Sequence, residues 1–312
     1  MKFGIGLNAN DPIPDVLAKG LEAERLGLDY VWVSDLPSQR YAPVVASATA
    51  LTTHKIRIGL GLISPFLHTP QQIASCLNTL IGSYGGRFEL CIGPGDREQL
   101  KRVGVDLDAL DNIPQHLLKA KKEISQALEN RGLECRIWLG AQGSKLLKTA
   151  QSFDGVLLNY SSPEMIGWAL EVTGKAQGGK PSLVGVFAPS YIHRTFKPEM
   201  YKLLQLSSAI VAVEASNSVL RRFSLLEALG PARRELLSKP LDSSVLKLIP
   251  PEVVEKFSIF KSQDELPTYI GELERLGVEH VVFSYPQGYS IESLGELAEG
   301  LSRIRGTYTQ VD

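Results

Sequence analysis

The chain has 312 residues, of which 44% are hydrophobic, which is enough to bury one large core or two domains of ordinary size. Its 33 Lys and Arg residues balance 34 Asp and Glu residues, leaving a net charge of −1, which argues against a nucleic acid or a membrane surface as partner. No apolar run reaches the roughly 18 residues that a bilayer span needs. A strand pattern starts at the first residues, so we expect no signal peptide and a cytoplasmic location.

Strand-like and helix-like segments alternate along the chain. Strands are predicted at 3–8, 29–34, 56–63, 87–92, 136–139, 154–158, 182–188 and 280–284. Helices are predicted at 13–26, 42–53, 70–82, 115–130, 144–152 and 163–176. Eight strands followed by helices predict an α/β fold, namely a closed (β/α)₈ TIM barrel. A doubly wound open sheet is the alternative, because periodicity alone does not show closure.

The alternation breaks between about residues 190 and 260, where long helical patterns and charged pairs replace it. We interpret this stretch as a helical insertion before the last strand, within a single domain of residues 1–312. Such an insertion covers the active rim or forms a dimer surface. On either side of it, segments 24–34 and 274–284 repeat one pattern of helix, glycine and strand, and Gly27 and Gly277 are predicted left-handed helix caps.

The segment 86–96, GRFELCIGPGD, is the most informative motif. Alternating Phe88, Leu90 and Ile92 predict a buried strand that ends in Gly93-Pro94-Gly95, a loop without side-chain bulk. Such a loop lets a flat molecule approach the main chain. Asp96 follows, placed either to cap the next helix or to face a ligand.

Three further strand ends carry small or polar residues. The segment 57–70 has Gly59 and Gly61 in a strand, and an ordinary strand with small residues is the plainer interpretation. The segment 138–144, WLGAQGS, opens a helix that carries lysines, which suits a phosphate group but also matches many simple caps. The segment 154–163 ends its strand in Asn159, which can contact the polar edge of a ligand or cap the next helix.

Other chemistries find little support. The five histidines show no metal-ligand spacing, so no metal is expected. No GxSxG elbow is present. The three cysteines, Cys76, Cys91 and Cys135, lack CxxC spacing and are predicted to be buried thiols. Apolar strands with glycine-rich ends instead suit a flat cofactor that carries its own reactivity.

Together these segments resemble the bacterial luciferase-like superfamily, and within it the archaeal methylenetetrahydromethanopterin reductases, which use the deazaflavin coenzyme F-420. The resemblance covers nearly the whole chain. The blocks that carry it are KFGIGL from Lys2, VSD from Val33, IGLGLISPFLHTP, GRFELCIGPGD, LGAQGSKLLKTA from Leu139, DGVLLN and FSYPQG from Phe283.

The resemblance implies a set of site residues. Gly61–Leu62 matches a non-prolyl cis peptide that supports the central ring of the cofactor. Asp35 and Asp96 match acids of the active rim and are the candidate catalytic residues. The implied cofactor-binding residues are Gly61, Leu62, Ile63, Ser64, Gly93, Gly140, Ala141, Gln142, Gly143 and Asn159. Of these, residues 140–143 match the loop near the phosphodiester of the coenzyme, and Asn159 matches a position close to the cofactor head.

The sequence also departs from the reductase pattern. Gly6 stands where the reductases carry a glutamate, a candidate proton donor near the pterin. Leu36 replaces a common histidine, and His68 replaces an expected arginine. Loss of a general acid typically costs about 10²–10⁴-fold in rate.

The resemblance therefore implies a deazaflavin-dependent oxidoreductase that transfers hydride to a pterin-like small molecule, with coenzyme F-420 (8-hydroxy-5-deazaflavin) as cofactor. Two alternatives stay open. One is an FMN-dependent luciferase-like monooxygenase or reductase, and the other is a non-catalytic flavin-binding barrel, which the departures at Gly6 and Leu36 favour. The family also implies a homodimer.

Overall fold

Eight parallel strands close into a barrel in the computed structural model, which describes residues 1–8, 10–174, 183–238 and 243–308. The strands are β1 (Lys2–Leu7), β2 (Tyr30–Val33), β3 (Arg57–Ile63), β4 (Phe88–Ile92), β5 (Arg136–Ala141), β6 (Gly155–Leu158), β7 (Leu183–His193) and β9 (His280–Ser284). β1 pairs with both β2 and β9, and β7 pairs with both β6 and β9, so the ring has no open edge. The TIM barrel is confirmed, and the open sheet is excluded.

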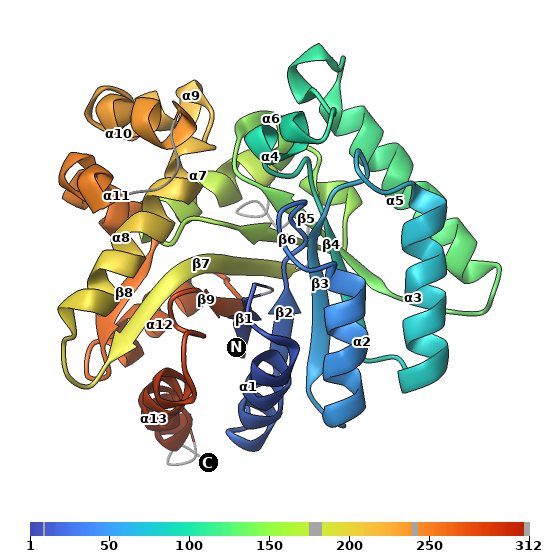
Figure 1. Ribbon diagram of the computed structural model, residues 1–312, viewed down its shortest axis with the longest axis horizontal. Helices are drawn as coiled ribbons and strands as arrows, with labels where there is room; N and C mark the ends of the chain where they lie inside the picture. The colour runs from blue at the N-terminus through green and yellow to red at the C-terminus, as the bar shows by residue number, and fades with distance from the viewer. Residues whose placement is uncertain (9, 175–182, 239–242, 309–312) are drawn as a thin grey trace.

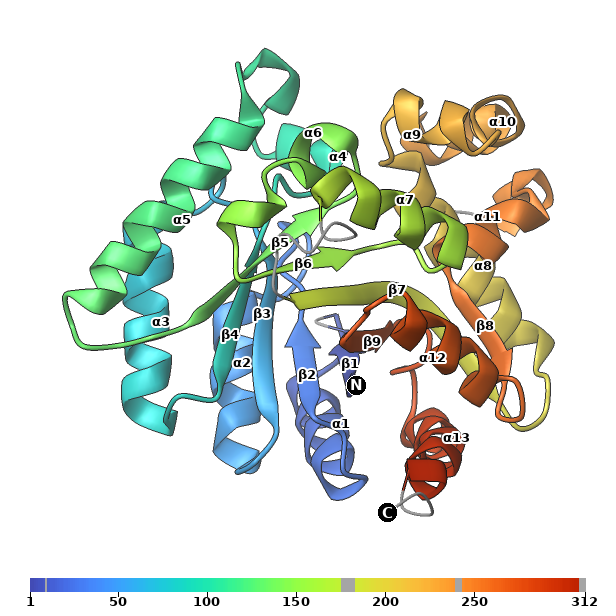
Figure 2. The same cartoon turned by 180° about the vertical axis from the view of Figure 1, so that it is seen from behind.

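Helices cover the outside of the barrel (Figure 1, and from behind in Figure 2). They are α1 (Ile13–Arg25), α2 (Ala42–Thr52), α3 (Pro70–Tyr84), α5 (Ile113–Glu129), α7 (Pro163–Thr173), α12 (Leu266–Arg275) and α13 (Ile291–Tyr308). Between them lie the short helices α4 (Arg97–Arg102), η1 (Leu107–Ala109), α6 (Ser144–Leu147) and η2 (Ala150–Ser152). Strand residues that face the helices, such as Ile5, Val31 and Val33, are fully buried, and this layer forms the main core.

A second core fills the inside of the barrel and is built from rings packed against glycines. Trp32 and Trp138 lie in it with ring centroids 6.4 Å apart. A Cβ atom on Gly59 would lie 2.1 Å from Trp32, and one on Gly155 would lie 2.4 Å from Trp138. The glycines in these strands therefore make room for indole rings, so the lower barrel is solidly packed.

A buried carboxylate closes the end of the barrel where the strands begin. Glu89 is fully buried and accepts hydrogen bonds from Tyr30 Oη (2.9 Å), Arg57 Nε (3.1 Å), Arg136 Nη1 (2.6 Å) and Trp138 Nε1 (2.7 Å). Four donors on three neighbouring strands, β2, β3 and β5, thus share the carboxylate of Glu89 on β4. This network ties β2, β3, β4 and β5 together at the end opposite to the rim that carries the candidate site.

The segment between β7 and β9 holds helices that gather on one side of β7, at the upper left in Figure 1 and the upper right in Figure 2. They are α8 (Pro198–Val213), α9 (Asn217–Arg222), α10 (Leu226–Ser238), η4 (Ser243–Leu248) and α11 (Pro251–Phe257). A ninth strand, β8 (Ile259–Ser262), then pairs in parallel with the outer half of β7. The sequence analysis missed β8, because four residues are too short to show a pattern and their partner lies in an extension of β7.

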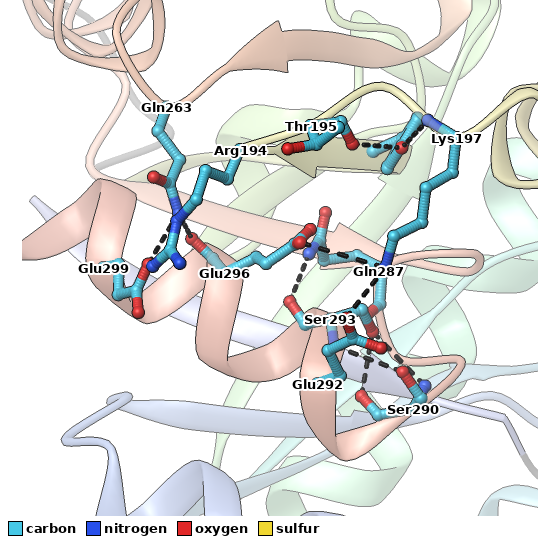
Figure 3. A network of polar contacts seen from close by, with 11 residues as sticks. Arg194, Thr195, Lys197, Gln263, Gln287, Ser290, Glu292, Ser293, Glu296 and Glu299 are labelled. Atoms are coloured by element: carbon cyan, nitrogen blue, oxygen red, sulfur yellow. Dashed lines mark hydrogen bonds and ion pairs between the residues drawn. The ribbon is translucent and has the colours of Figure 1, made fainter.

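The outer half of β7 is fastened to α13 by the polar network in Figure 3. Gln287 is fully buried, accepts a hydrogen bond from Ile192 N (2.6 Å) and donates one to Ser293 O (2.6 Å). The ion pair of Lys197 with Glu292 (2.9 Å) adds a surface link. The loop after β9 is thereby held near β1, where a Cβ on Gly288 would lie 2.9 Å from Gly6 O.

Local predictions are confirmed at the two helix caps and corrected in one helix. Gly27 and Gly277 have φ values of 76° and 83°, as expected of left-handed caps. The helix predicted at 144–152 is instead split into α6 and η2. Thr149 Oγ1 donates to Leu146 O (2.7 Å) at the break, a local bond that competes with continued helix. Residues 175, 176 and 182 of two further predicted elements lie outside the described residues.

Candidate active site

Three of the predicted cofactor residues meet at the end of the barrel where the strands finish. The Gly61–Leu62 peptide is cis, as the resemblance implied, and the pairing of β3 with β4 shifts register between Leu60 and Ile63. Cβ atoms on Gly93 and Gly140 would lie 2.3 and 2.5 Å from Leu62 Cδ1. The side chain of Leu62 therefore lies across the two glycines. We call Leu62, Gly93 and Gly140 the floor of the site.

Asn159 offers a polar group beside this floor. It directly follows β6, and its Oδ1 is buried without a hydrogen-bond partner among the described residues. A buried amide oxygen left unpaired costs free energy, so the position suits a ligand that supplies an N–H donor.

The observed contacts of Ser64 and Ile63 are with other residues of the protein. Ser64 Oγ donates to Pro94 O (2.7 Å) and so fixes the Gly93–Gly95 loop against the end of β3. Ile63 is buried in the main core and pairs with Ile92 on β4. Their direct contact with a cofactor stays a prediction.

The loop after β5 contacts the insertion. Ala141 is buried at the end of β5, and Gln142 Nε2 donates to Val211 O on α8 (3.1 Å). Gly143 O accepts from Leu147 N (3.1 Å) in the first turn of α6. In this structure the side chain of Gln142 is therefore engaged with α8.

Asp35 lies toward the helical layer. Its Oδ2 is 2.7 Å from His68 Nε2, and its Oδ1 accepts from Ala42 N (3.3 Å) at the start of α2. Its side chain is only 4% exposed. These contacts tie the ends of β2 and β3 to α2, and the catalytic role of Asp35 stays a prediction.

Asp96 is the cap of α4, since its Oδ1 accepts from Gln99 N (2.9 Å). The sequence left capping and ligand contact open for this residue. The cap is present, and a role toward a substrate stays a prediction.

Glu214 is a rim residue that the sequence analysis missed. It follows α8, and its Oε2 accepts from Arg97 N (3.4 Å) beside Asp96. Burial and the neighbouring Asp96 carboxylate raise the pKa of Glu214 to about 7. No sequence signal marked it, because only the fold brings α8 to the loop after β4.

The raised pKa of Glu214 predicts a pH-dependent stability. The unfolded chain releases this proton near pH 4.5 and the folded chain near pH 7, so the folded state binds more protons between these values and unfolding becomes easier as pH rises. The loss is at most about 3 kcal/mol above pH 7. We therefore expect Glu214→Gln to be more stable than wild type at pH 8 and nearly equal at pH 4.5, as measured by urea unfolding.

Glu227→Gln is the control for this experiment, because Glu227 is exposed on α10. It should retain the pH profile of the wild type. A Glu214→Gln variant that also retains that profile would contradict the assignment.

The chain is similar in sequence to several known proteins. The family model described as luciferase-like monooxygenase matches residues 1–115. The curated 5,10-methylenetetrahydromethanopterin reductase of Archaeoglobus fulgidus is 29% identical, over 92% of this chain and 94% of that protein. The chain resembles the luciferase-like monooxygenases and, over nearly its full length, these reductases.

Solved structures give the same fold. The coenzyme F-420-dependent tetrahydromethanopterin reductase of Methanopyrus kandleri superposes with a TM-score of 0.81 at 23% identity, covering 95% of this chain and 97% of that one. The oxygenating constituent of a Pseudomonas putida diketocamphane monooxygenase, in complex with FMN, superposes with a TM-score of 0.64 at 15% identity, covering 97% and 98%. These superpositions agree with the TIM barrel predicted from the sequence.

Two further features concern the described residues as a whole. They contain no group of three or more His, Cys, Asp or Glu side chains arranged to hold a metal ion. None of the helices in these residues is both long and apolar enough to cross a membrane.

Proposed function

We propose that this chain is an oxidoreductase that uses coenzyme F-420 to transfer hydride to a pterin-like substrate of the methylenetetrahydromethanopterin type. Two lines of support carry the proposal. The first is similarity to the Archaeoglobus fulgidus reductase over 92% of the chain. The second is the floor of Leu62, Gly93 and Gly140 with Asn159 beside it, which is the single structural observation on which the proposal depends.

The residues present fit a flat tricyclic cofactor. Gly93 and Gly140 leave room for Leu62, whose side chain gives the floor an apolar face. The unpaired Asn159 Oδ1 would accept a hydrogen bond from an N–H on the ring edge. When bound, the deazaflavin supplies the hydride from its central ring carbon.

The other tasks fall to the protein. The floor would orient the ring and exclude water from one of its faces. We assign the phosphodiester side to the Gly140–Gly143 loop, where Gln142 would exchange its bond to Val211 O for one to the ligand. Proton handling is assigned to Asp96 rather than Asp35, because Asp96 lies beside Glu214 whereas Asp35 is bonded to α2 and His68.

An FMN-dependent enzyme is the second candidate, and the fold shared with the FMN-bound diketocamphane monooxygenase constituent favours it. Deazaflavin lacks the ring nitrogen that oxygen chemistry requires, so the two candidates differ in their reaction with oxygen. A non-catalytic barrel remains the third candidate, because Gly6 carries no carboxyl group.

Titration of the purified protein with coenzyme F-420 and with FMN, followed by ligand fluorescence, tests the proposal. We expect F-420 to bind at least ten times more tightly than FMN, and Asn159→Ala to weaken binding several-fold because the ring loses one hydrogen bond. The control is Asn130→Ala, which changes an exposed asparagine at the end of α5. We also expect reduced F-420 to be oxidised when methylenetetrahydromethanopterin is added anaerobically.

Each rival has its own result. Tight FMN binding with oxygen uptake would replace the proposal with a monooxygenase. Binding of neither ligand would favour the non-catalytic barrel.

We further propose a cytoplasmic homodimer, with α2 and α3 near the contact. The outer face of α2 supports this, because Val44 and Leu51 are 60% and 68% exposed and Tyr41 before it is 49% exposed. Large apolar side chains so exposed on one helix are typical of a surface that another molecule covers.

A further inference from the structure

A partly exposed phenylalanine lies at the rim on the side formed by β1, β9 and β7. Phe187 is on β7 and is partly exposed, while its neighbours Val186 and Ala188 are fully buried. Its ring centroid is 6.2 Å from that of Trp32, which is fully buried in the barrel. Phe187 is therefore the uppermost ring of the aromatic interior, with one side against Trp32 and part of its surface open.

The residues around this ring are small because the ring occupies their space. A Cβ atom on Gly6 would lie 3.2 Å from Phe187 Cε2 and 3.0 Å from Ser284 Cβ. Both distances are shorter than ordinary carbon contacts, so any side chain at position 6 would push against the ring or against β9. Gly6 thus leaves Phe187 in its present place.

The three residues that meet on this side of the rim carry no charge. Gly6 has no side chain, Phe187 contributes an aromatic ring, and Ser284 contributes a hydroxyl group. The strand order places β7 and β9 across the barrel from β3, which carries Leu62 of the floor. An aromatic ring in such a position binds another ring by offset or edge contact, which adds to simple burial of area.

We propose that Phe187 determines substrate specificity by packing its ring against the planar ring of the substrate, in a space that exists because residue 6 is glycine. The inference rests on the proposed function and specifies its substrate side. The ligand class is an uncharged heteroaromatic or partly reduced bicyclic ring. A substrate whose reacting end carries an anionic group would gain nothing from this surface.

Kinetics with methylenetetrahydromethanopterin and calorimetric titration with tetrahydromethanopterin test the inference. Phe187→Leu should raise KM and the substrate Kd about tenfold, the upper range of a ring–ring contact, with kcat changed less than threefold. Phe187→Tyr keeps the ring and should stay within threefold of wild type. The F-420 Kd should change less than twofold in both variants, because that ligand is assigned to the floor.

A larger side chain at position 6 gives a second test of the role of Phe187. Gly6→Ala should raise KM about as much as Phe187→Leu, because the new methyl group displaces the ring. The double variant Gly6→Ala/Phe187→Leu should lose less than the sum of the two single variants, because leucine relieves the contact with the ring although the contact with Ser284 stays. Phe196→Leu is the matched control, since Phe196 is 48% exposed on the loop beyond β7 and should change none of these constants.

The outcomes separate the inference from the function on which it rests. If wild type binds F-420 and reduces the pterin while Phe187→Leu and Phe187→Tyr behave alike, the inference is overturned and the proposed function stands. If Phe187→Leu weakens F-420 and pterin equally, the residue supports the fold or the cofactor and the inference also fails. A wild-type protein that binds no pterin overturns both.

Discussion

Replacing Glu89 with leucine is expected to lower the free energy of unfolding by about 3–5 kcal/mol, the largest stability effect among the changes considered. The reason is the number of groups that depend on one carboxylate. Tyr30, Arg57, Arg136 and Trp138 all donate to Glu89, whose own side chain is fully buried. Removing this carboxylate leaves four donors on three other strands without their hydrogen-bond acceptor.

The two arginines limit the size of the loss. The side chains of Arg57 and Arg136 are 38% and 40% exposed, so each can turn toward water when Glu89 is absent. Tyr30 Oη and Trp138 Nε1 have no such freedom, because both rings lie in the packed interior. Their unpaired polar atoms account for much of the cost, at about 1–3 kcal/mol each.

Urea unfolding measures this effect. The m-value of each variant should equal that of wild type, which shows that unfolding exposes the same surface area. Glu89→Gln should cost less than Glu89→Leu, because the amide oxygen still accepts hydrogen bonds. The control is Glu22→Gln, which breaks an exposed pair with Arg25 on α1 and should leave the midpoint unchanged. A Glu89→Leu midpoint equal to that of the control would show that the network contributes nothing to stability.

The position of this network gives the two ends of the barrel different tasks. Glu89 and its donors lie where the strands begin, whereas Leu62, Gly93, Gly140 and Asn159 lie where they finish. Barrel enzymes generally separate stability and chemistry in this way. Ligand affinity of the folded Glu89 variants should therefore stay close to that of wild type.

The closed barrel could be predicted from the sequence because each strand is a local pattern. Runs such as 87–92 alternate over enough residues to reveal a buried strand, and Gly27 and Gly277 mark helix ends by a backbone geometry that glycine favours. β8 could not be predicted in this way. Its four residues become a strand only because β7 extends past the barrel and offers a free edge.

The candidate site was predictable only in part. The glycines at 93 and 140 follow from the rule that bare loops admit flat ligands, and the structure brings both to Leu62. The direction of Asp35 was not predictable. In β2, Trp32 faces the barrel interior and Val33 faces the helices, yet both are apolar and buried. The sequence therefore does not tell which of the two sides Asp35 faces. Glu214 depends on contact between α8 and a loop more than 100 residues earlier, as the bond from Arg97 N shows.

Replacing Gly140 with alanine is expected to weaken F-420 binding by about 10²-fold, if the floor holds the cofactor as proposed. The new Cβ would lie 2.5 Å from Leu62 Cδ1 and 3.3 Å from Cys91 Sγ. Cys91 is buried against Trp32 and Trp138 in the interior, so we expect Leu62 to move toward the open side. That movement carries a methyl group into the space assigned to the ring.

Gly140→Ala should reduce the stability of the fold less than it reduces the affinity for F-420. The atom in the way is the end of a flexible side chain, so overpacking should cost about 1–3 kcal/mol and leave a folded protein. Gly167→Ala in α7 is the matched control, because no atom lies within 4 Å of its new Cβ and alanine is the better helix former. It should be slightly more stable than wild type, with unchanged affinity for F-420.

The double variant Gly140→Ala/Leu62→Ala decides between a displaced floor and a general disturbance of the loop after β5. Leu62→Ala removes the crowded methyl groups, so the double variant should bind F-420 better than Gly140→Ala alone even though it has lost apolar contact. Fluorescence titration of all four proteins gives the coupling energy directly. If Gly140→Ala binds F-420 as tightly as wild type does, the ring does not lie on Leu62, and the proposed cofactor site must be sought elsewhere on the rim.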